Sequence, residues 1–300
     1  MNYIHSIYTS LLGMAVLTLF STTSIHAGEV ALSERAVIKR QDSFADPQGQ
    51  NTLIVHNIFG AIDVQGHAGD DIQIVASKSI YAENRADLKQ GMEEVELRVE
   101  NLGNQLYVFL DLPLVSFNAT TGEISYEGYW QRDKHRHTGY RHLLDITIRI
   151  PRHTSLKLSA INDGAITVNG IDADFLNVSN INGAIELVDV AGQTRVNAIN
   201  KDVHIAYRSN PPAESSFETI NGDLNISFAG TPDAEVIYQT MHGDLYTAYD
   251  VTPMKPQVEV QNKQRNRGIK YQLNADSRLQ LGAGGAVYRF KTLNGDIRLQ

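Results

Sequence analysis

The sequence predicts an all-β chain wound as a single-domain, β-helix-like β-solenoid with about 20-residue repeats and one short helix near its N-terminal part. Three observations predict this fold. A short pattern of an aliphatic residue, Asn, Gly, a small or acidic residue and a second aliphatic residue recurs along the second half of the chain. Consecutive copies between Ile161 and Met241 lie 18 to 21 residues apart. Segments of alternating apolar and polar residues flank the copies, as in strands with one buried face.

The recurring pattern has the chemistry of a tight turn. Asn and Gly tolerate positive φ, so the backbone can reverse there at little steric cost. An acidic residue follows Gly in some copies only, because Ala165 and Ala184 occupy the same place in others. We therefore interpret the recurring positions as structural turns: Asn162, Gly164, Asn182, Gly183, Asn221, Gly222, Asp223, Gly243, Asp244, Asn294, Gly295 and Asp296.

One repeat of this length is too small to bury a core of its own, so its stability must come from stacking on its neighbours. Strands that lie at the same phase in successive repeats would then pair edge to edge and form a continuous aliphatic column. A sandwich of ordinary Asn-Gly hairpins also predicts alternation and is the alternative. The regular period, with the same residue classes at the same phase, favours the solenoid.

The segments outside the regular repeat read differently. Strand-like alternation runs from Val55 to Ala76, and Leu88 and Met92 share one face of a short helix expected over 81–92. Strands are expected over 95–99, 106–110 and 144–150, and Gly282–Gly285 is expected to form a tight connection. Two segments break the rhythm: a polar and aromatic loop over 116–142 and a basic insertion over 253–274.

The N-terminal segment has the character of a secretory signal. An almost unbroken apolar run from Leu11 to Phe20 is followed by small and polar residues and then by Ile25-His26-Ala27. We expect 1–27 to be a signal peptide cleaved before Gly28, residues 28–50 to be a linker and 51–300 to form the β-domain. The stretch before the apolar run carries no Lys or Arg, so an uncleaved anchor is the alternative.

The composition excludes several classes of protein. There is no Cys, which excludes disulfides, thiolate metal sites, Cys nucleophiles and a lipid-modified cysteine. The 26 basic and 34 acidic residues give a net charge of −8, which argues against nucleic acid as a partner. With no second apolar stretch of spanning length, we expect no transmembrane segment after signal cleavage and a location in the periplasm, cell envelope or extracellular space.

The order of these segments resembles a known family. Asp145-Ile146-Thr147-Ile148-Arg149-Ile150-Pro151, the alternation over 156–160 and the serial Asn-Gly units are similar to the toastrack family, an adhesin-type β-strand-repeat family of bacterial envelope proteins. The segments Gly60–Val64 and Asp71–Ile74 fit its N-terminal portion, so the resemblance covers about residues 50–300. It implies an exported or membrane-tethered β-solenoid without established catalysis. The 116–142 loop and the 253–274 insertion depart from the family.

Each candidate functional site in the sequence also has a purely structural interpretation. The turn aspartates could suggest a calcium ladder, but calcium-binding solenoids use a shorter Gly-rich repeat, so hydrogen bonding within the turns is favoured. No residues recur as a catalytic pair, and no cofactor or metal is expected. The 116–142 loop is the most unusual stretch and the main candidate for interaction. It could hold a metal ion through His135 and His137, or its aromatic residues could stack on a sugar or a partner protein. The favoured interpretation is that it caps the open end of the apolar column. The candidate interaction residues of this loop are Tyr126, Tyr129, Trp130, His135, Arg136, His137, Tyr140 and Arg141.

The sequence therefore predicts a non-catalytic, exported envelope protein that acts as a scaffold or as an adhesin-like interaction protein. Its expected partner is an envelope protein, a glycan or a second copy of itself. The alternative is a secreted β-helix that binds or cleaves a glycan through the 126–142 loop. The basic run from Lys263 to Lys270 could contact an anionic lipid or glycan, but the favoured interpretation is that it forms a solvated loop.

Overall fold

The computed structural model describes residues 20–21, 32–128, 139–255, 257–265 and 268–300, and for 20–21 and 257–276 it describes the backbone only. The prediction of an all-β chain is confirmed: α1 (Arg85–Glu94) is the one helix whose bounds lie within the described residues, and the other elements are strands. These are β1 (Phe20–Ser21), β2 (Leu32–Ser43), β3 (Thr52–Phe59), β4 (Ile62–His67), β5 (Asp71–Ala82), β6 (Glu96–Asn101), β7 (Gln105–Asp111), β8 (Ser116–Asn118), β9 (Glu123–Ser125), β10 (Tyr140–Pro151), β11 (Ser155–Asn162), β12 (Ile166–Asn169), β13 (Asp172–Asn180), β14 (Ile185–Ala198), β15 (Val203–Tyr207), β16 (Ser215–Glu218), β17 (Leu224–Ser227), β18 (Ala234–Gln239), β19 (Leu245–Thr247), β20 (Val251–Pro253), β21 (Gln257–Arg265), β22 (Gly268–Leu281), β23 (Ala286–Lys291) and β24 (Ile297–Leu299).

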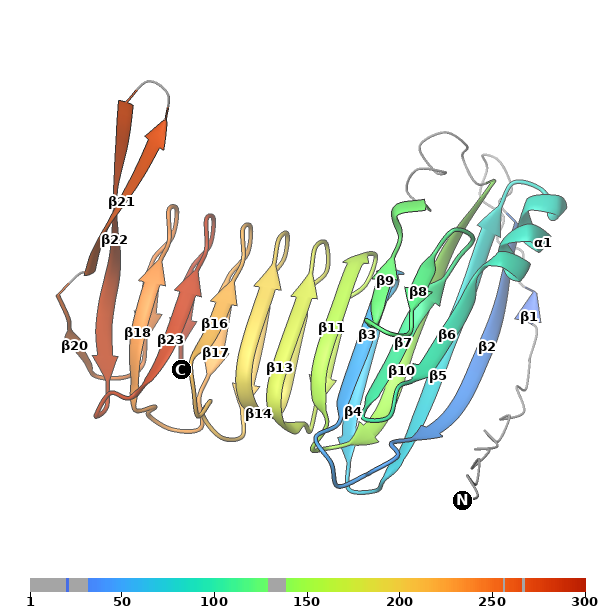
Figure 1. The fold of residues 1–300 in the computed structure, drawn as a ribbon, viewed down its shortest axis with the longest axis horizontal. Coiled ribbons are helices and arrows are strands. Elements are labelled where there is room, and N and C mark those ends of the chain that lie inside the picture. Colours follow the sequence, from blue (N-terminus) through green and yellow to red (C-terminus); the bar gives the residue numbers. More distant parts are fainter. Residues whose placement is uncertain (1–19, 22–31, 129–138, 256, 266–267) are drawn as a thin grey trace, which may run out of the picture.

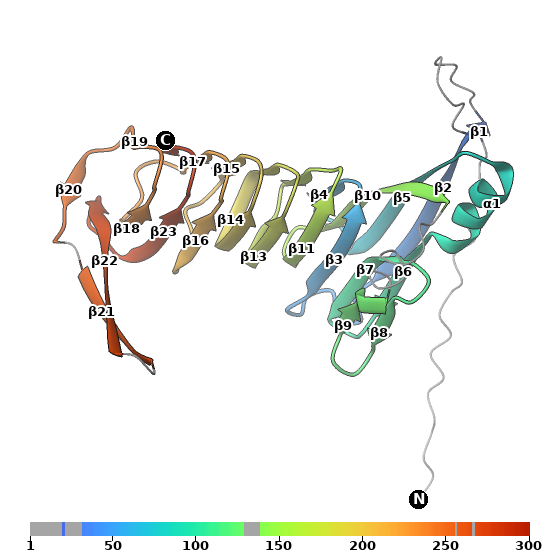
Figure 2. The same cartoon turned by 90° about the horizontal axis from the view of Figure 1, so that it is seen from above.

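Parallel pairing joins segments that are far apart in the sequence into two long rows of strands (Figures 1 and 2). Row A consists of β4, β12, the first half of β14, β15, β17, β24 and β19. Row B consists of β7, β3, β11, β13, the second half of β14, β16, β23 and β18. From β11 on, a corner that contains the Asn-Gly pattern or a variant of it leads from a row B strand to a row A strand. We call one such strand–corner–strand unit a level.

The core lies between the two rows and follows directly from the alternation in the sequence. In row A, the apolar residues Ile62, Ile166 and Ile185 stand in register on neighbouring strands, and all three are fully buried. Aromatic residues fill the same space at later levels, where Phe217 and Phe290 stack with ring centroids 4.8 Å apart. Burial of these side chains is the main favourable term that holds the levels together.

The N-terminal end of row A is extended by three further strands. β10 pairs parallel with β4, β5 pairs antiparallel with β10 and β2 antiparallel with β5, and α1 packs beside them (Figure 1). The Lys78 ammonium beneath the helix donates to the carbonyls of Met92 and Val95 at 2.6 and 2.8 Å. These bonds satisfy a cation that is largely enclosed.

Two expectations about this end were wrong. The segment 28–50 was expected as a linker, but β2 occupies most of it, because its residues pair with β5 along their whole length. The helix was expected to begin near Tyr81, but Tyr81 and Ala82 still belong to β5, where they pair with Arg141 and Tyr140. The helix begins after Asn84, whose side chain accepts from the Asp87 N–H at 3.0 Å as an N-cap.

The C-terminal end departs from the sequence order of the levels. The level formed by β23 and β24 lies between the level of β16 and β17 and that of β18 and β19. Sequential stacking of the copies was expected, so the expected position of the last copy was wrong. Beyond β18, row B is extended by β22 and then β20, and β21 and β22 extend as a hairpin away from the stack (Figure 1). In the described part of the chain, no helix is long and apolar enough to cross a membrane.

Candidate functional site

The corners of successive levels carry a continuous ladder of asparagine side chains. Each amide donates from Nδ2 to the Oδ1 of the asparagine on the level before it. The donor–acceptor distances are 2.6 Å from Asn182 to Asn162, 2.8 Å from Asn200 to Asn182, 3.0 Å from Asn221 to Asn200 and 2.7 Å from Asn294 to Asn221. His242 takes the asparagine place on the last level, next to Asn294. The asparagines therefore connect levels as well as allowing the turn.

Because each interior amide of this ladder both donates and accepts, removing one member breaks two hydrogen bonds at once. We expect Asn182→Ala to lower the free energy of unfolding by about 1–2 kcal/mol, because exposed amide hydrogen bonds contribute modestly. Urea denaturation followed by circular dichroism measures the change. Asn197→Ala is the matched control, since Asn197 is an exposed asparagine on β14 with no side-chain hydrogen bond among the described residues. Equal losses in the two variants would contradict the ladder's role.

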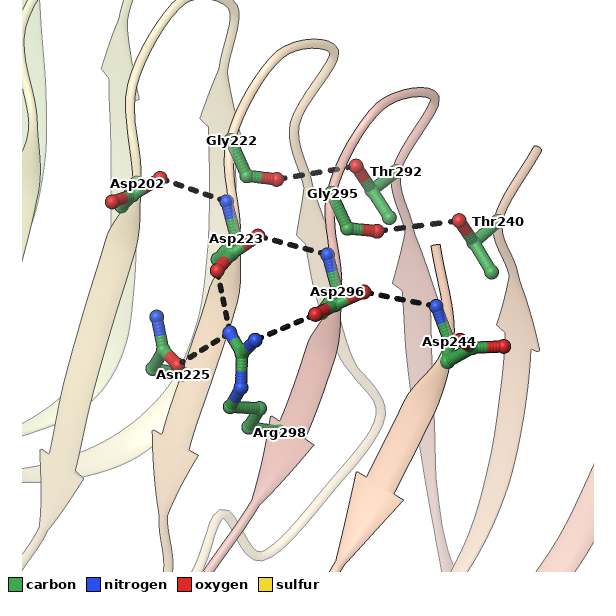
Figure 3. A network of polar contacts seen from close by, with 10 residues as sticks. All are labelled: Asp202, Gly222, Asp223, Asn225, Thr240, Asp244, Thr292, Gly295, Asp296 and Arg298. Carbon is green, nitrogen blue, oxygen red and sulfur yellow. Dashed lines mark hydrogen bonds and ion pairs between the residues drawn. The ribbon is translucent and has the colours of Figure 1, made fainter. Parts of the chain in front are cut away.

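A second ladder, of aspartates, runs beside the asparagines over the last levels (Figure 3). The Oδ1 of each aspartate accepts from the backbone N–H of the aspartate on the next level. The distances are 2.8 Å from Asp223 N to Asp202, 2.9 Å from Asp296 N to Asp223 and 3.0 Å from Asp244 N to Asp296. The ladder follows the spatial order of the levels, in which Asp296 precedes Asp244.

Arg298 neutralises the middle of the aspartate ladder. Its guanidinium lies 2.5 Å from Oδ2 of Asp223 and 2.5 Å from Oδ2 of Asp296 (Figure 3). Partial burial acts to raise the pKa of Asp223, but the Asp296 N–H and the Arg298 guanidinium outweigh it, so that the pKa lies below its ordinary value. Both oxygens of Asp223 and both oxygens of Asp296 are thus engaged within the protein.

A lowered folded-state pKa makes Asp223 a source of pH-dependent stability. The contribution is present above the unfolded pKa, about 3.9, and is lost as the pH falls through the lower folded value. We expect Asp223→Asn to lower the free energy of unfolding by about 1 kcal/mol at neutral pH. The loss is small because the carboxylate is about a third exposed, so solvent screens its ion pair with Arg298. Thermal unfolding of both proteins between neutral and acidic pH measures this. A difference in Tm that persists unchanged in strong acid would contradict the assignment to the charge of Asp223.

The structure places only part of the predicted interaction loop. Tyr126 is half-buried, packs against the core and donates from its hydroxyl to the Leu110 carbonyl at 3.1 Å. Tyr140 is buried in β10, and Arg141 follows it on the same strand, close to the Tyr81 ring. Tyr129, Trp130, His135, Arg136 and His137 lie outside the described residues. The remaining prediction, that this loop caps an end of the column, therefore stays a prediction.

The β8–β9 hairpin of the same loop covers the outer face of row B near the N-terminal end. Phe117 and Ile124 pack with Ile54, Tyr107 and Phe109 in a small cluster apart from the main core. Here the outward positions of row B are apolar and hidden by the hairpin. From β11 to β23 the outward positions of row B are mostly polar and at least partly exposed.

This open face of row B holds a set of residues that the sequence analysis did not single out. Five outward positions stand in register across neighbouring strands, and we call them the basic row: Lys157 on β11, Asn177 on β13, Arg195 on β14, Ser216 on β16 and Arg289 on β23. The cations occur on every second strand. Lys157, Asn177, Arg195 and Ser216 line a groove of about 300 Å³ together with Phe175 and Glu214.

The cations of the basic row differ in their partners. Arg289 donates from Nε to Glu214 at 2.8 Å, and the Lys157 ammonium lies 5.7 Å from the centroid of the Phe175 ring. Arg195 is exposed and has no ion pair among the described residues. Two cations of the groove are therefore available to an anionic ligand.

Metal binding has no ready set of ligands in the described part of the chain, where no group of three or more His, Asp or Glu side chains is placed to hold an ion. Of the turn aspartates that could suggest calcium, Asp223 and Asp296 direct their carboxylate oxygens at backbone N–H groups and at Arg298. This arrangement supports a structural role for them.

Comparison with known proteins gives similarity in structure only. No family model and no curated protein matches this chain. A crystal structure of a "putative cell adhesion protein" from Clostridium sporogenes is similar, with 10% identity, a TM-score of 0.37 and coverage of 88% of this chain and 98% of that one. A "putative adhesin" from Bacteroides fragilis has 12% identity and a TM-score of 0.30, and the match covers 88% of this chain and 97% of that one. A "putative adhesin" from Parabacteroides merdae has 8% identity and a TM-score of 0.21, and the match covers 88% of this chain and 96% of that one. At these identities and TM-scores, none of the three structures supports a conclusion about the function of this chain.

Proposed function

We propose that this chain is a non-catalytic, exported β-solenoid of the cell envelope that serves as a rigid scaffold for interaction. The observation that carries the proposal is the use of the recurring polar side chains. The asparagines bond to one another and the aspartates bond to the next level, so the repeated groups are consumed in holding the levels together. A catalytic or ligand-binding ladder would leave such groups free to face a substrate.

The parallel register of the two rows supports classification as a β-solenoid. Each level repeats the same two strands and corner at the same phase, and each contacts chiefly the levels beside it. Such stacks are extended and resist bending, which suits a protein that presents a surface over a distance. The fully covered aliphatic column between the rows supplies the stiffness.

One end of the stack supports an interaction role. Among the described strands β19 pairs only with β24, so it forms the outer edge of row A. Met241 and Tyr246 at this level are 69% and 52% exposed. Unpaired strand edges beside apolar side chains are sites where another strand can add. A second copy of the chain or an envelope protein would fit there.

Export and the absence of turnover can be tested together. The full-length chain, produced in a Gram-negative host, is fractionated and the isolated protein is weighed by mass spectrometry. We expect a periplasmic product that begins at Gly28. We also expect no release of reducing ends from a panel of neutral and acidic polysaccharides. A cytoplasmic product would contradict export, and turnover that is lost on Trp130→Ala would favour the glycan-cleaving alternative.

A further inference from the structure

The basic row provides what an extended anionic ligand requires. Neighbouring strands in a sheet lie about 4.8 Å apart, so cations on every second strand recur about every 9.6 Å. Lys157, Arg195 and Arg289 follow this spacing along the stacking direction, and a neutral polar residue separates each pair. A ligand lying along this row would meet a positive charge, a hydrogen-bonding group and a positive charge in turn.

The corresponding outward positions of row A do not repeat a row of cations. Asp63 and Glu186 flank Thr167 in register, and the same row continues through His204 and Asn225 to Arg298. The chain as a whole has a net charge of −8. The cation of this row on row A, Arg298, is already paired with Asp223 and Asp296, whereas the groove of row B offers Lys157 and Arg195 to an anionic ligand.

The groove also contains a non-polar surface suited to sugar. Phe175 lines it beside Lys157 and Asn177. The aliphatic face of a sugar ring packs on an aromatic ring, while its hydroxyls bond to amides and hydroxyls such as those of Asn177 and Ser216. A carboxylate on the same polymer would accept from Lys157 or Arg195, and hydrogen bonds between charged partners are the stronger ones.

We propose that the basic row binds a linear acidic polysaccharide that lies along the stacking direction. The carboxylate of about every second sugar would then face one cation of the row. The inference rests on the proposed function, because it assigns a partner to the scaffold. A polynucleotide fits less well. Its phosphates occur on every nucleotide, and its bases require a series of aromatic platforms, whereas Phe175 is the aromatic residue in this groove.

The probes for the test are de-esterified polygalacturonate, the same polymer fully methyl-esterified, and single-stranded DNA. Binding to the purified mature chain is measured by isothermal titration calorimetry at low and high salt. We expect binding of the acidic polymer that weakens with salt, and no binding of the neutral ester. Lys157→Gln with Arg195→Gln should lower the affinity about tenfold or more, since each removes a charged hydrogen bond.

The matched control is Arg35→Gln with Lys39→Gln, which removes the same two charges from exposed positions of β2. It should bind as the unchanged protein does, and circular dichroism should show all proteins folded. Equal binding of the neutral ester, tighter binding of DNA, or equal losses in the two double variants would overturn the proposal. Reducing ends released in the same samples would instead contradict the non-catalytic function and leave the binding result standing.

Discussion

Replacing Phe290 by alanine is expected to lower the free energy of unfolding by about 3–5 kcal/mol. Phe290 is 1% exposed and lies on β23, the strand inserted between β16 and β18. Its ring stacks on that of Phe217, with centroids 4.8 Å apart, and stands in register with Tyr238 on the other side. Truncation to alanine would leave a cavity in the middle of the aromatic column, where neither neighbouring level can close it without shifting.

Urea denaturation with circular dichroism measures this loss, and hydrogen exchange shows where it is felt. We expect the amides of β18 and β22 to lose protection, because the inserted level joins these strands to the rest of the stack. Arg289→Ala and Lys291→Ala, on the outer face of the same strand, should change stability by less than about 1 kcal/mol. A loss below about 1 kcal/mol for Phe290→Ala would show that β23 is not packed as described.

The inserted level marks a limit of what the sequence could predict. The alternation and the Asn-Gly pattern define the phase of each level, and the structure keeps that phase throughout. The pattern does not define which level follows which, because the copies at Ile220, Met241 and Leu293 carry the same residue classes. The copy at Ile220 leads into β17, and either of the two later copies has the residue classes to pair with β17 in the same register. The long β20–β22 excursion lets the later segment take the earlier place.

The edges of the fold were harder to predict for another reason. β2 carries charged residues at outward positions and pairs on one side with β5, so its sequence lacks the strong apolar alternation of an interior strand. The turn residues were recognised, but their partners were not. Local sequence indicates a turn, whereas a hydrogen bond from Asn294 to Asn221 depends on the spatial order of the levels.

The basic row could not be found by scanning the sequence. Lys157, Arg195 and Arg289 are isolated cations in three separate strands, and the intervals between them differ. They become neighbours only when the strand register is known. The cluster of aromatic and basic residues over 126–142 is evident in the sequence, because residues close together along the chain need no structure to be recognised as neighbours.

Substitution of Gly183, the glycine of one corner, is expected to have the second large effect on stability. A Cβ built on Gly183 would lie 1.8 Å from the Gly164 carbonyl oxygen on the preceding level, and 2.5 Å from Nδ2 of Asn180. Asn180 is fully buried, accepts from the Gly183 N–H at 3.1 Å and donates to the Gly164 carbonyl at 3.1 Å. A side chain at this position would therefore force two levels apart and break the hydrogen bonds of a buried amide.

We expect Gly183→Val to lower the free energy of unfolding by about 3–5 kcal/mol, which combines overpacking with the loss of buried hydrogen bonds. Lys201 supplies the control, because it occupies the glycine place in its own copy of the pattern and is exposed. Lys201→Val should change stability by less than about 1 kcal/mol. Thermal and urea unfolding of both variants provide the comparison. Similar losses in the two would mean that the corner resists any β-branched residue, and that close contact between Gly183 and Gly164 is not the cause.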